Sequence, residues 1–95
     1  MSQADSVVSV DNDHVRVTTW TFAASGTAIG HHRHEFDYVV VPVTGGTFRV
    51  IDADGSERVM EQVAGSPYLG AAGTEHDVVS TSPEETVFVE IELKH

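Results

Sequence analysis

Short strand-like segments separated by turn residues run through the whole chain, and no stretch has the spacing of a helix. Val, Thr, Ile and aromatic residues recur in short runs between turns that contain Gly, Asp or Pro. β-branched and aromatic residues favour strands, and turn residues at regular intervals are typical of proteins built from strands alone. Because no helix separates these strands, we predict an all-β fold, a small antiparallel β-barrel or jelly roll.

The pattern predicts nine strands, at residues 6–10, 14–23, 28–34, 36–43, 47–52, 57–63, 68–70, 77–81 and 86–93. Asp54-Gly55 favours a hairpin, because Gly adopts the positive φ that tight hairpin turns require. The last strand alternates in character, with Glu90 and Glu92 on the same face as Phe88. We interpret Glu90 and Glu92 as part of a solvated edge or an interface, since they resemble a catalytic carboxylate pair only superficially.

Size and composition indicate one folded domain over residues 1–95, with residues 1–5 loose. A chain of this length buries only about 60–65% of its unfolded surface, so a bound metal or a partner subunit would add needed stability. We therefore expect a homodimer, because small barrels often bury an exposed sheet face or edge against a second copy.

Charge and composition exclude several classes of partner. Fifteen acidic and five basic residues give a net charge of −10, which disfavours binding to nucleic acid or to anionic membranes. The chain contains no cysteine, so it has neither disulfides nor thiolate metal ligands. The first residues lack the basic and apolar regions of a signal peptide, and no apolar stretch is long enough to span a bilayer. We expect a soluble, cytoplasmic protein.

Histidines form the strongest functional signal. Three of the six crowd into His31-His32-Arg33-His34. Residues two apart on a strand share a face, so His32 and His34 project together while their neighbours project oppositely. A third imidazole is available from His76, which follows a glycine-containing turn. A His-x-His pair alone is a weak signal, because a single strand histidine is more often a core or surface residue. The pair together with His76 predicts a metal site.

The spacing of these residues resembles the two sequence motifs of the cupin family. Gly26, His32, His34 and Gly45 match the first motif without a gap, and Gly65, Gly73 and His76 match the second. Ala71 stands where the second motif usually has Pro, and Ser80 where it usually has Asn. The segment HRHEFDYVVVPVTGG, with EHDV and FVEIEL further on, is similar to small single-domain cupins (cupin 2 conserved barrel) of the beta-alanine degradation type. The resemblance implies a double-stranded β-helix and a metal held by His32, His34 and His76.

One position departs from the family pattern. Tyr38 occupies the place of the usual Glu ligand, and Asp37 before it has the wrong parity to reach the metal from a regular strand. Tyr38 is therefore a fourth ligand, a hydrogen-bonding acid beside the metal, or an aromatic residue of the barrel core with its hydroxyl satisfied. Among the other aromatic residues, Tyr68 is the candidate for binding substrate, because it lies close to the second motif.

Three neutral imidazoles leave the charge of a divalent metal uncompensated, so the site favours a small anionic molecule such as a carboxylate. Imidazole ligands suit Fe, Zn, Ni or Cu, and Mn is a further candidate. The first functional hypothesis is a metal-dependent enzyme, a cupin-type oxygenase, lyase or isomerase that acts on a small carboxylate-bearing metabolite with Tyr38 moving a proton. The alternatives are a metal-dependent binding or sensing module without turnover, and a barrel that the metal merely stabilises.

Overall fold

The structure, a computed structural model, describes residues 2–94; Met1 and His95 lie outside the described residues. All regular elements within that range are strands, as predicted. They are β1 (Asp5–Asp11), β2 (Val15–Phe22), β3 (His32–Arg33), β4 (Asp37–Pro42), β5 (Gly46–Asp52), β6 (Glu57–Gln62), β7 (Tyr68–Gly70), β8 (Glu75–Ser80) and β9 (Thr86–Leu93). A helix able to cross a membrane is absent from residues 2–94.

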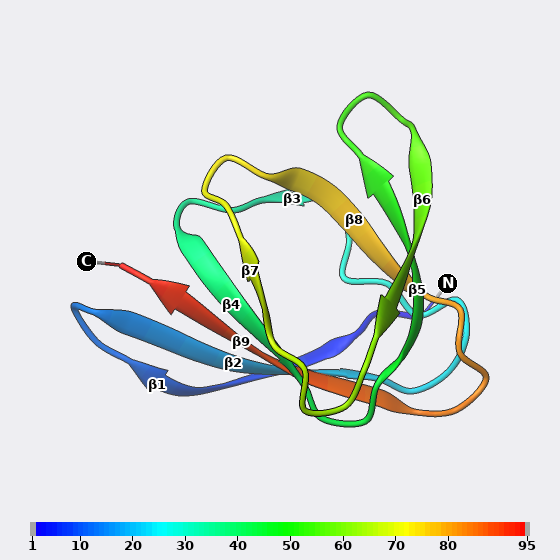
Figure 1. The fold of residues 1–95 in the computed structure, drawn as a ribbon, viewed down its shortest axis with the longest axis horizontal. Coiled ribbons are helices and arrows are strands. Elements are labelled where there is room, and N and C mark those ends of the chain that lie inside the picture. The colour runs from blue at the N-terminus through cyan, green and yellow to red at the C-terminus, as the bar shows by residue number, and fades with distance from the viewer. Residues whose placement is uncertain (1, 95) are drawn as a thin grey trace.

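The strands form two antiparallel sheets that face each other across the interior (Figure 1). One sheet has five strands in the order β1-β2-β9-β4-β7, and the other has four in the order β3-β8-β5-β6. The chain passes repeatedly from one sheet to the other, so that strands distant in sequence become neighbours. This arrangement is the jelly-roll form of a β-barrel, and it confirms the predicted fold class.

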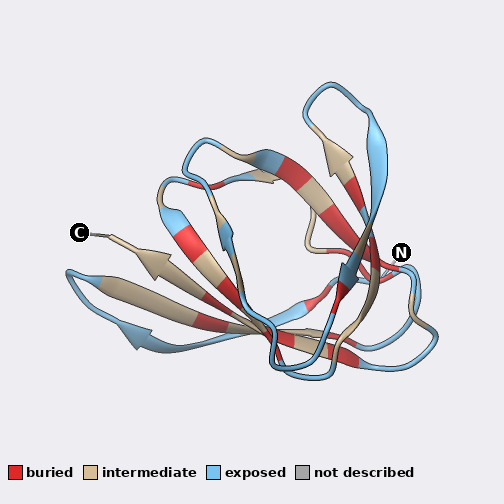
Figure 2. Cartoon of the chain, viewed as in Figure 1, coloured by how far each residue is buried: buried red, intermediate tan, exposed pale blue. Residues whose placement is uncertain are grey.

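Alternation of side chains decides what enters the barrel. Buried positions alternate with less buried ones along β4 and the first part of β9 (Figure 2). Phe22, Phe48 and Phe88 fill part of the interior, with ring centroids 5.2 to 5.9 Å apart. Contacts at these distances and tilted or edge-on angles stabilise aromatic clusters beyond the burial of area alone.

The N-terminal residues differ from the prediction. Residues 1–5 were expected to be loose, but Ala4 is only 5% exposed and belongs to the core cluster. Its backbone nitrogen donates to the carbonyl of Ala28, and Ala28 donates to the carbonyl of Ser2. Residues 2–5 are therefore held against the barrel, because a small apolar side chain fits beneath the chain that leads to β3.

The strand predicted over residues 28–34 is reduced to β3. Gly30 has φ of +102°, in the left-handed region that strands do not use. Its backbone nitrogen donates to Asp77 Oδ1 at 3.0 Å, and the chain changes direction just before His32. The predicted hairpin between β5 and β6 is present, with Gly55 at φ +87° in the four-residue loop that the predicted strands leave between them.

Candidate metal centre

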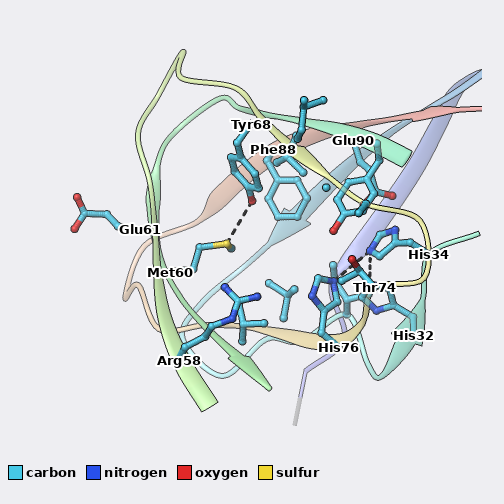
Figure 3. A pocket seen from close by; sticks show the side chains of 18 residues that line it. His32, His34, Arg58, Met60, Glu61, Tyr68, Thr74, His76, Phe88 and Glu90 are labelled. Carbon is cyan, nitrogen blue, oxygen red and sulfur yellow. Dashed lines mark hydrogen bonds between the residues drawn. The ribbon is translucent and has the colours of Figure 1, made fainter. Parts of the chain in front are cut away.

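Two neighbouring segments of the four-stranded sheet bring three imidazoles together. His32 on β3 is paired in register with His76 on β8. His34 follows β3, where its backbone nitrogen donates to the carbonyl of Thr74 at 2.8 Å. All three side chains point inward, and His34 Nε2 lies 3.1 Å from His32 Nε2 and 3.2 Å from His76 Nε2 (Figure 3). The structure thus brings together the three histidines that the sequence selected.

Hydrogen bonding and burial favour neutral imidazoles whose lone pairs face one another. His32 Nδ1 lies 2.7 Å from the carbonyl oxygen of Gly30. A carbonyl only accepts, so Nδ1 carries the proton and Nε2 of the neutral ring presents its lone pair to the cluster. Burial, together with the neighbouring histidines, lowers the pKa of His34 to about 4. Burial also lowers the pKa of His76 to about 4, with smaller contributions from His32 and Arg58.

The separations of these nitrogens suit a common cation. Metal–imidazole bonds of about 2.0–2.1 Å at angles between right and tetrahedral place two ligand nitrogens about 2.8–3.4 Å apart. The two measured separations, 3.1 and 3.2 Å, fall inside that interval. One ligand atom from each of the three residues lies within 4.8 Å of the others. The donor set and its spacing therefore fit a divalent metal.

Residues next to the cluster in sequence face away from it. His31 Nε2 lies 2.9 Å from Glu75 Oε1 on the exposed side of the sheet. Arg33 is also exposed. Asp37 is exposed too, and its carboxylate accepts a hydrogen bond from the backbone of Ala72 at 2.9 Å. The expected parity of all three residues is confirmed.

Tyr38 is tightly packed between His34 and Gly70, next to the histidine cluster. Its ring stacks on the imidazole of His34, with centroids 3.9 Å apart and planes 17° from parallel. Gly70 lies opposite Tyr38 in the register of β4 and β7, and a methyl group at Gly70 would come within 1.9 Å of Tyr38 Cζ. Burial, and next the nearby Glu90, raises the pKa of Tyr38, so its hydroxyl keeps its proton at neutral pH. The stacked position favours a proton-bearing or packing role over that of a fourth metal ligand.

A cavity of about 560 Å³ opens from the cluster. A volume of this size is within the usual range for small-molecule sites. Tyr68, the residue predicted to bind substrate, lines the cavity. Its hydroxyl accepts a hydrogen bond from Gln62 at 3.0 Å and lies 3.4 Å from the sulfur of Met60. Phe48 does not line the cavity; it belongs to the core and is fully buried.

Two functional candidates in the cavity wall escaped the sequence analysis. Glu90 lines the cavity and is 8% exposed, so the interpretation of this residue as a solvated edge is wrong. Burial, and next the charge of Glu92, raises the pKa of Glu90 to about 7. Arg58 on β6 also lines the cavity. Glu90 shares the inward face of β9 with Phe88, which was the available signal; nothing in the pattern around Arg58 set it apart.

His32 and His34 also line a second, smaller cavity of about 250 Å³. Trp20 lines it together with Glu90. The indole nitrogen of Trp20 is buried and has no hydrogen-bond partner among the described residues. His32, His34 and Glu90 therefore line both cavities.

Comparison with known proteins places the chain in a family. It is 49% identical over 92 residues to the beta-alanine degradation protein BauB of Pseudomonas aeruginosa PAO1, covering 97% of this chain and 95% of BauB. A cupin domain from Bordetella pertussis Tohama I, known from its crystal structure, matches with a TM-score of 0.93 and 40% identity over 99% of this chain and 96% of that one. The chain is a small cupin. No protein-family model matches this cupin.

More distant structures share the fold of this cupin. A cupin superfamily protein from Desulfitobacterium hafniense has a TM-score of 0.75 at 15% identity, covering 98% of this chain and 79% of that one. A double-stranded β-helix protein from Klebsiella pneumoniae has a TM-score of 0.78 at 19% identity, covering 97% and 77%. The double-stranded β-helix that the family resemblance implied is confirmed.

Proposed function

We propose that this cupin binds one divalent metal through His32, His34 and His76 and uses it to hold a small carboxylate-bearing molecule. The observation that carries the proposal is the convergence of three imidazole nitrogens, with separations of 3.1 and 3.2 Å, at the wall of a cavity. Fe, Zn, Ni, Mn and Cu are the candidate metals, because imidazole suits several of them equally. The bound metal supplies a Lewis acid that polarises a ligand oxygen or lowers the pKa of a bound water.

The charge of the site supports an anionic ligand. Three neutral imidazoles leave the positive charge of the metal uncompensated. The name of BauB, which this chain matches at 49% identity, refers to beta-alanine degradation and supports a small carboxylate metabolite as the ligand. Tyr68 contributes a polar hydroxyl to the wall on which such a ligand rests.

Two proton-bearing groups in the cavity favour an enzyme over a binding module. Tyr38 and Glu90 both line the cavity with the cluster. With a pKa of about 7, Glu90 exchanges a proton near neutral pH, which is the range in which general acids and bases work best. The neutral hydroxyl of Tyr38 donates a hydrogen bond to a ligand oxygen. A metal-dependent oxygenase, lyase or isomerase is thus the favoured class; a sensor without turnover is the alternative.

Elemental analysis of protein purified without chelator tests the metal centre. The wild type should hold one metal per chain, and His76→Ala should lose most of it. His31→Ala is the matched control, because His31 is the same residue type in the same segment but pairs with Glu75 on the outer side. Full occupancy in His76→Ala, or equal loss in both variants, would contradict the assignment. A metabolite screen on the loaded protein then separates turnover from binding.

A further inference from the structure

The wall of the main cavity contains one permanent cation. Of the described residues that line this cavity, Arg58 is the only Arg or Lys. Figure 3 shows its side chain among the cavity residues, whereas the neighbouring Glu61 points away from them. Arg58 lines this cavity together with His76, Tyr38 and Tyr68.

The guanidinium of Arg58 carries N–H donors that its ion pair with Asp52 does not use. Its Nε contacts Asp52 Oδ2 at 3.3 Å, which is its single ion pair within residues 2–94. The planar guanidinium carries five N–H donors in a fork that matches the two oxygens of a carboxylate. In a chain of net charge −10, the general field repels anions, so a cation at the cavity locally reverses that field.

We propose that Arg58 holds the carboxylate of the ligand, and that a second oxygen of the same molecule faces the histidine cluster. The ligand class is then a short acid with two oxygen functions, such as a dicarboxylate or an oxo or hydroxy acid. This inference rests on the proposed metal centre, because the cluster binds the second oxygen through its metal. The carboxyl group of Glu90, when protonated, adds a hydrogen-bond donor on the facing sheet.

Calorimetric titration of the metal-loaded protein with malonate, and with neutral malonamide, tests the role of Arg58. Malonate should bind, and malonamide should bind at least tenfold more weakly. Arg58→Met should lower malonate affinity by about tenfold or more, because charge-assisted hydrogen bonds contribute on that scale. Arg49→Met is the matched control, since Arg49 pairs with Glu57 at 3.2 Å and is absent from the cavity wall.

The outcomes separate this inference from the metal proposal. Normal metal content with unchanged malonate affinity in Arg58→Met would overturn the role of Arg58 and leave the metal centre intact. A wild type that holds metal but fails to bind malonate at millimolar concentration would also overturn it. A wild type that holds no metal would instead remove the proposed function itself.

A second inference comes from the opposite side of the five-stranded sheet. The register aligns one outward-facing apolar residue from every strand in a single row. The row consists of Val10, Val17, Ile91, Val39 and Leu69. A parallel row beside it holds Val7, Thr19, Val89 and Val41. Val7, Val10 and Leu69 are 65%, 41% and 77% exposed, so much of this apolar face is open to solvent.

The size and charge of this face fit a second copy of the chain. The five strands contain three to eight residues each, and at about 4.8 Å between strands and about 3.3 Å per residue they cover roughly 500 Å². Two such faces together bury about 1,000 Å², the area that a biological interface is expected to reach. The two rows contain no charged residue. Two chains of net charge −10 can therefore meet there without opposing like charges at the contact.

We infer that this cupin forms a two-fold dimer through the outward face of its five-stranded sheet. The contact would lie directly behind the cavity, because β4 and β9 present Val39 and Ile91 outward while they present Tyr38 and Glu90 inward. Dimer formation would then hold in place the two strands that carry these cavity residues.

Light scattering at about 50 μM tests the dimer. The wild type should have twice the 10.2 kDa mass of one chain, and Ile91→Lys should have the monomer mass. Val59→Lys is the control, because Val59 is 81% exposed on the other sheet and should leave the dimer intact. A monomeric wild type, or a dimeric Ile91→Lys, would overturn the inference.

A cysteine variant keeps the test informative should Ile91→Lys fail to fold. The chain has no cysteine, so a single engineered one reports on a single contact. Near the two-fold axis, Val89→Cys or Val17→Cys should oxidise to a covalent dimer, whereas Val59→Cys should not. Cross-linking that is equal at all three positions, or absent at both central ones, would contradict the interface.

Discussion

Replacing Gly70 by alanine tests how the barrel positions its cluster. The added methyl carbon would lie 1.9 Å from Tyr38 Cζ and 2.3 and 2.4 Å from two neighbouring ring carbons. Carbon atoms in contact need about 3.5 Å, so the ring must move by about 1.6 Å. It has no room on its far side, because it already stacks on His34 at 3.9 Å. Gly70→Ala must therefore displace His34 or drive Tyr38 out of its place.

Both consequences have a measurable size. Overpacking of this kind typically costs about 1–3 kcal/mol, which in a domain of this length lowers the melting temperature by roughly 5–15 °C. Displacing His34 should also weaken metal binding by about 10- to 100-fold, the usual effect of disturbing groups that orient a ligand. Thermal unfolding and metal titration measure the two effects separately.

A double-mutant cycle supplies the control. In a Tyr38→Ala background the space beside Gly70 is empty, so Gly70→Ala should be neutral or stabilise by up to about 1 kcal/mol, because alanine restricts the unfolded chain more than glycine does. The reasoning is refuted if Gly70→Ala leaves stability and metal affinity unchanged, or if it costs the same in both backgrounds.

Three further predictions concern acidity, chemistry and packing. In metal-free protein, His34 and His76 should destabilise the fold as the pH falls from about 6.5 toward 4, because the unfolded state binds their protons first, by about 2.7 kcal/mol per pH unit for the pair. Glu90 acts in the opposite direction between about pH 7 and 4.5, because the folded state binds its proton first. Denaturant titrations between pH 6.5 and 5 should therefore show a net loss of stability of about 1.4 kcal/mol per pH unit. Glu90→Gln should make this loss steeper. Tyr38→Phe should keep the metal while lowering turnover or anion affinity; unchanged values would reduce Tyr38 to packing. Phe48→Ala should cost about 3–5 kcal/mol in chemical denaturation, because Phe48 is fully buried, and a loss below about 1 kcal/mol would contradict its place in the core.

Much of the fold was predictable because strand length and turn residues are local properties. The predicted strands match the observed ones apart from their ends, and β3 is short because Gly30 departs from extended backbone. His32 and His34 were identifiable because residues two apart on a strand share a face. His76 was identifiable through the glycine turn that precedes it and through the spacing of the family motifs. The pairing of His76 with His32 in the register of β3 and β8 explains why residues at that spacing meet.

The remainder of the site depends on which face of a strand is inward, and alternation alone does not decide that. On β9 the aliphatic residues face outward, while Phe88 and Glu90 face the cavity. Hydrophobic periodicity predicts that the aliphatic face of β9 is the buried one, and it therefore places Glu90 on the exposed face. Arg58 was equally hidden, because the residue pattern of β6 does not show which of its side chains line the cavity. The contact between Gly70 and Tyr38 arises only from the pairing of β4 with β7.

Metal K-edge X-ray absorption of the loaded protein tests the central claim most directly. Three imidazole nitrogens at about 2.0–2.1 Å should surround the metal in the wild type, and two in His76→Ala reloaded with excess metal. A wild-type spectrum with one imidazole or none would contradict the account, because the metal would then be bound somewhere other than the cluster of His32, His34 and His76.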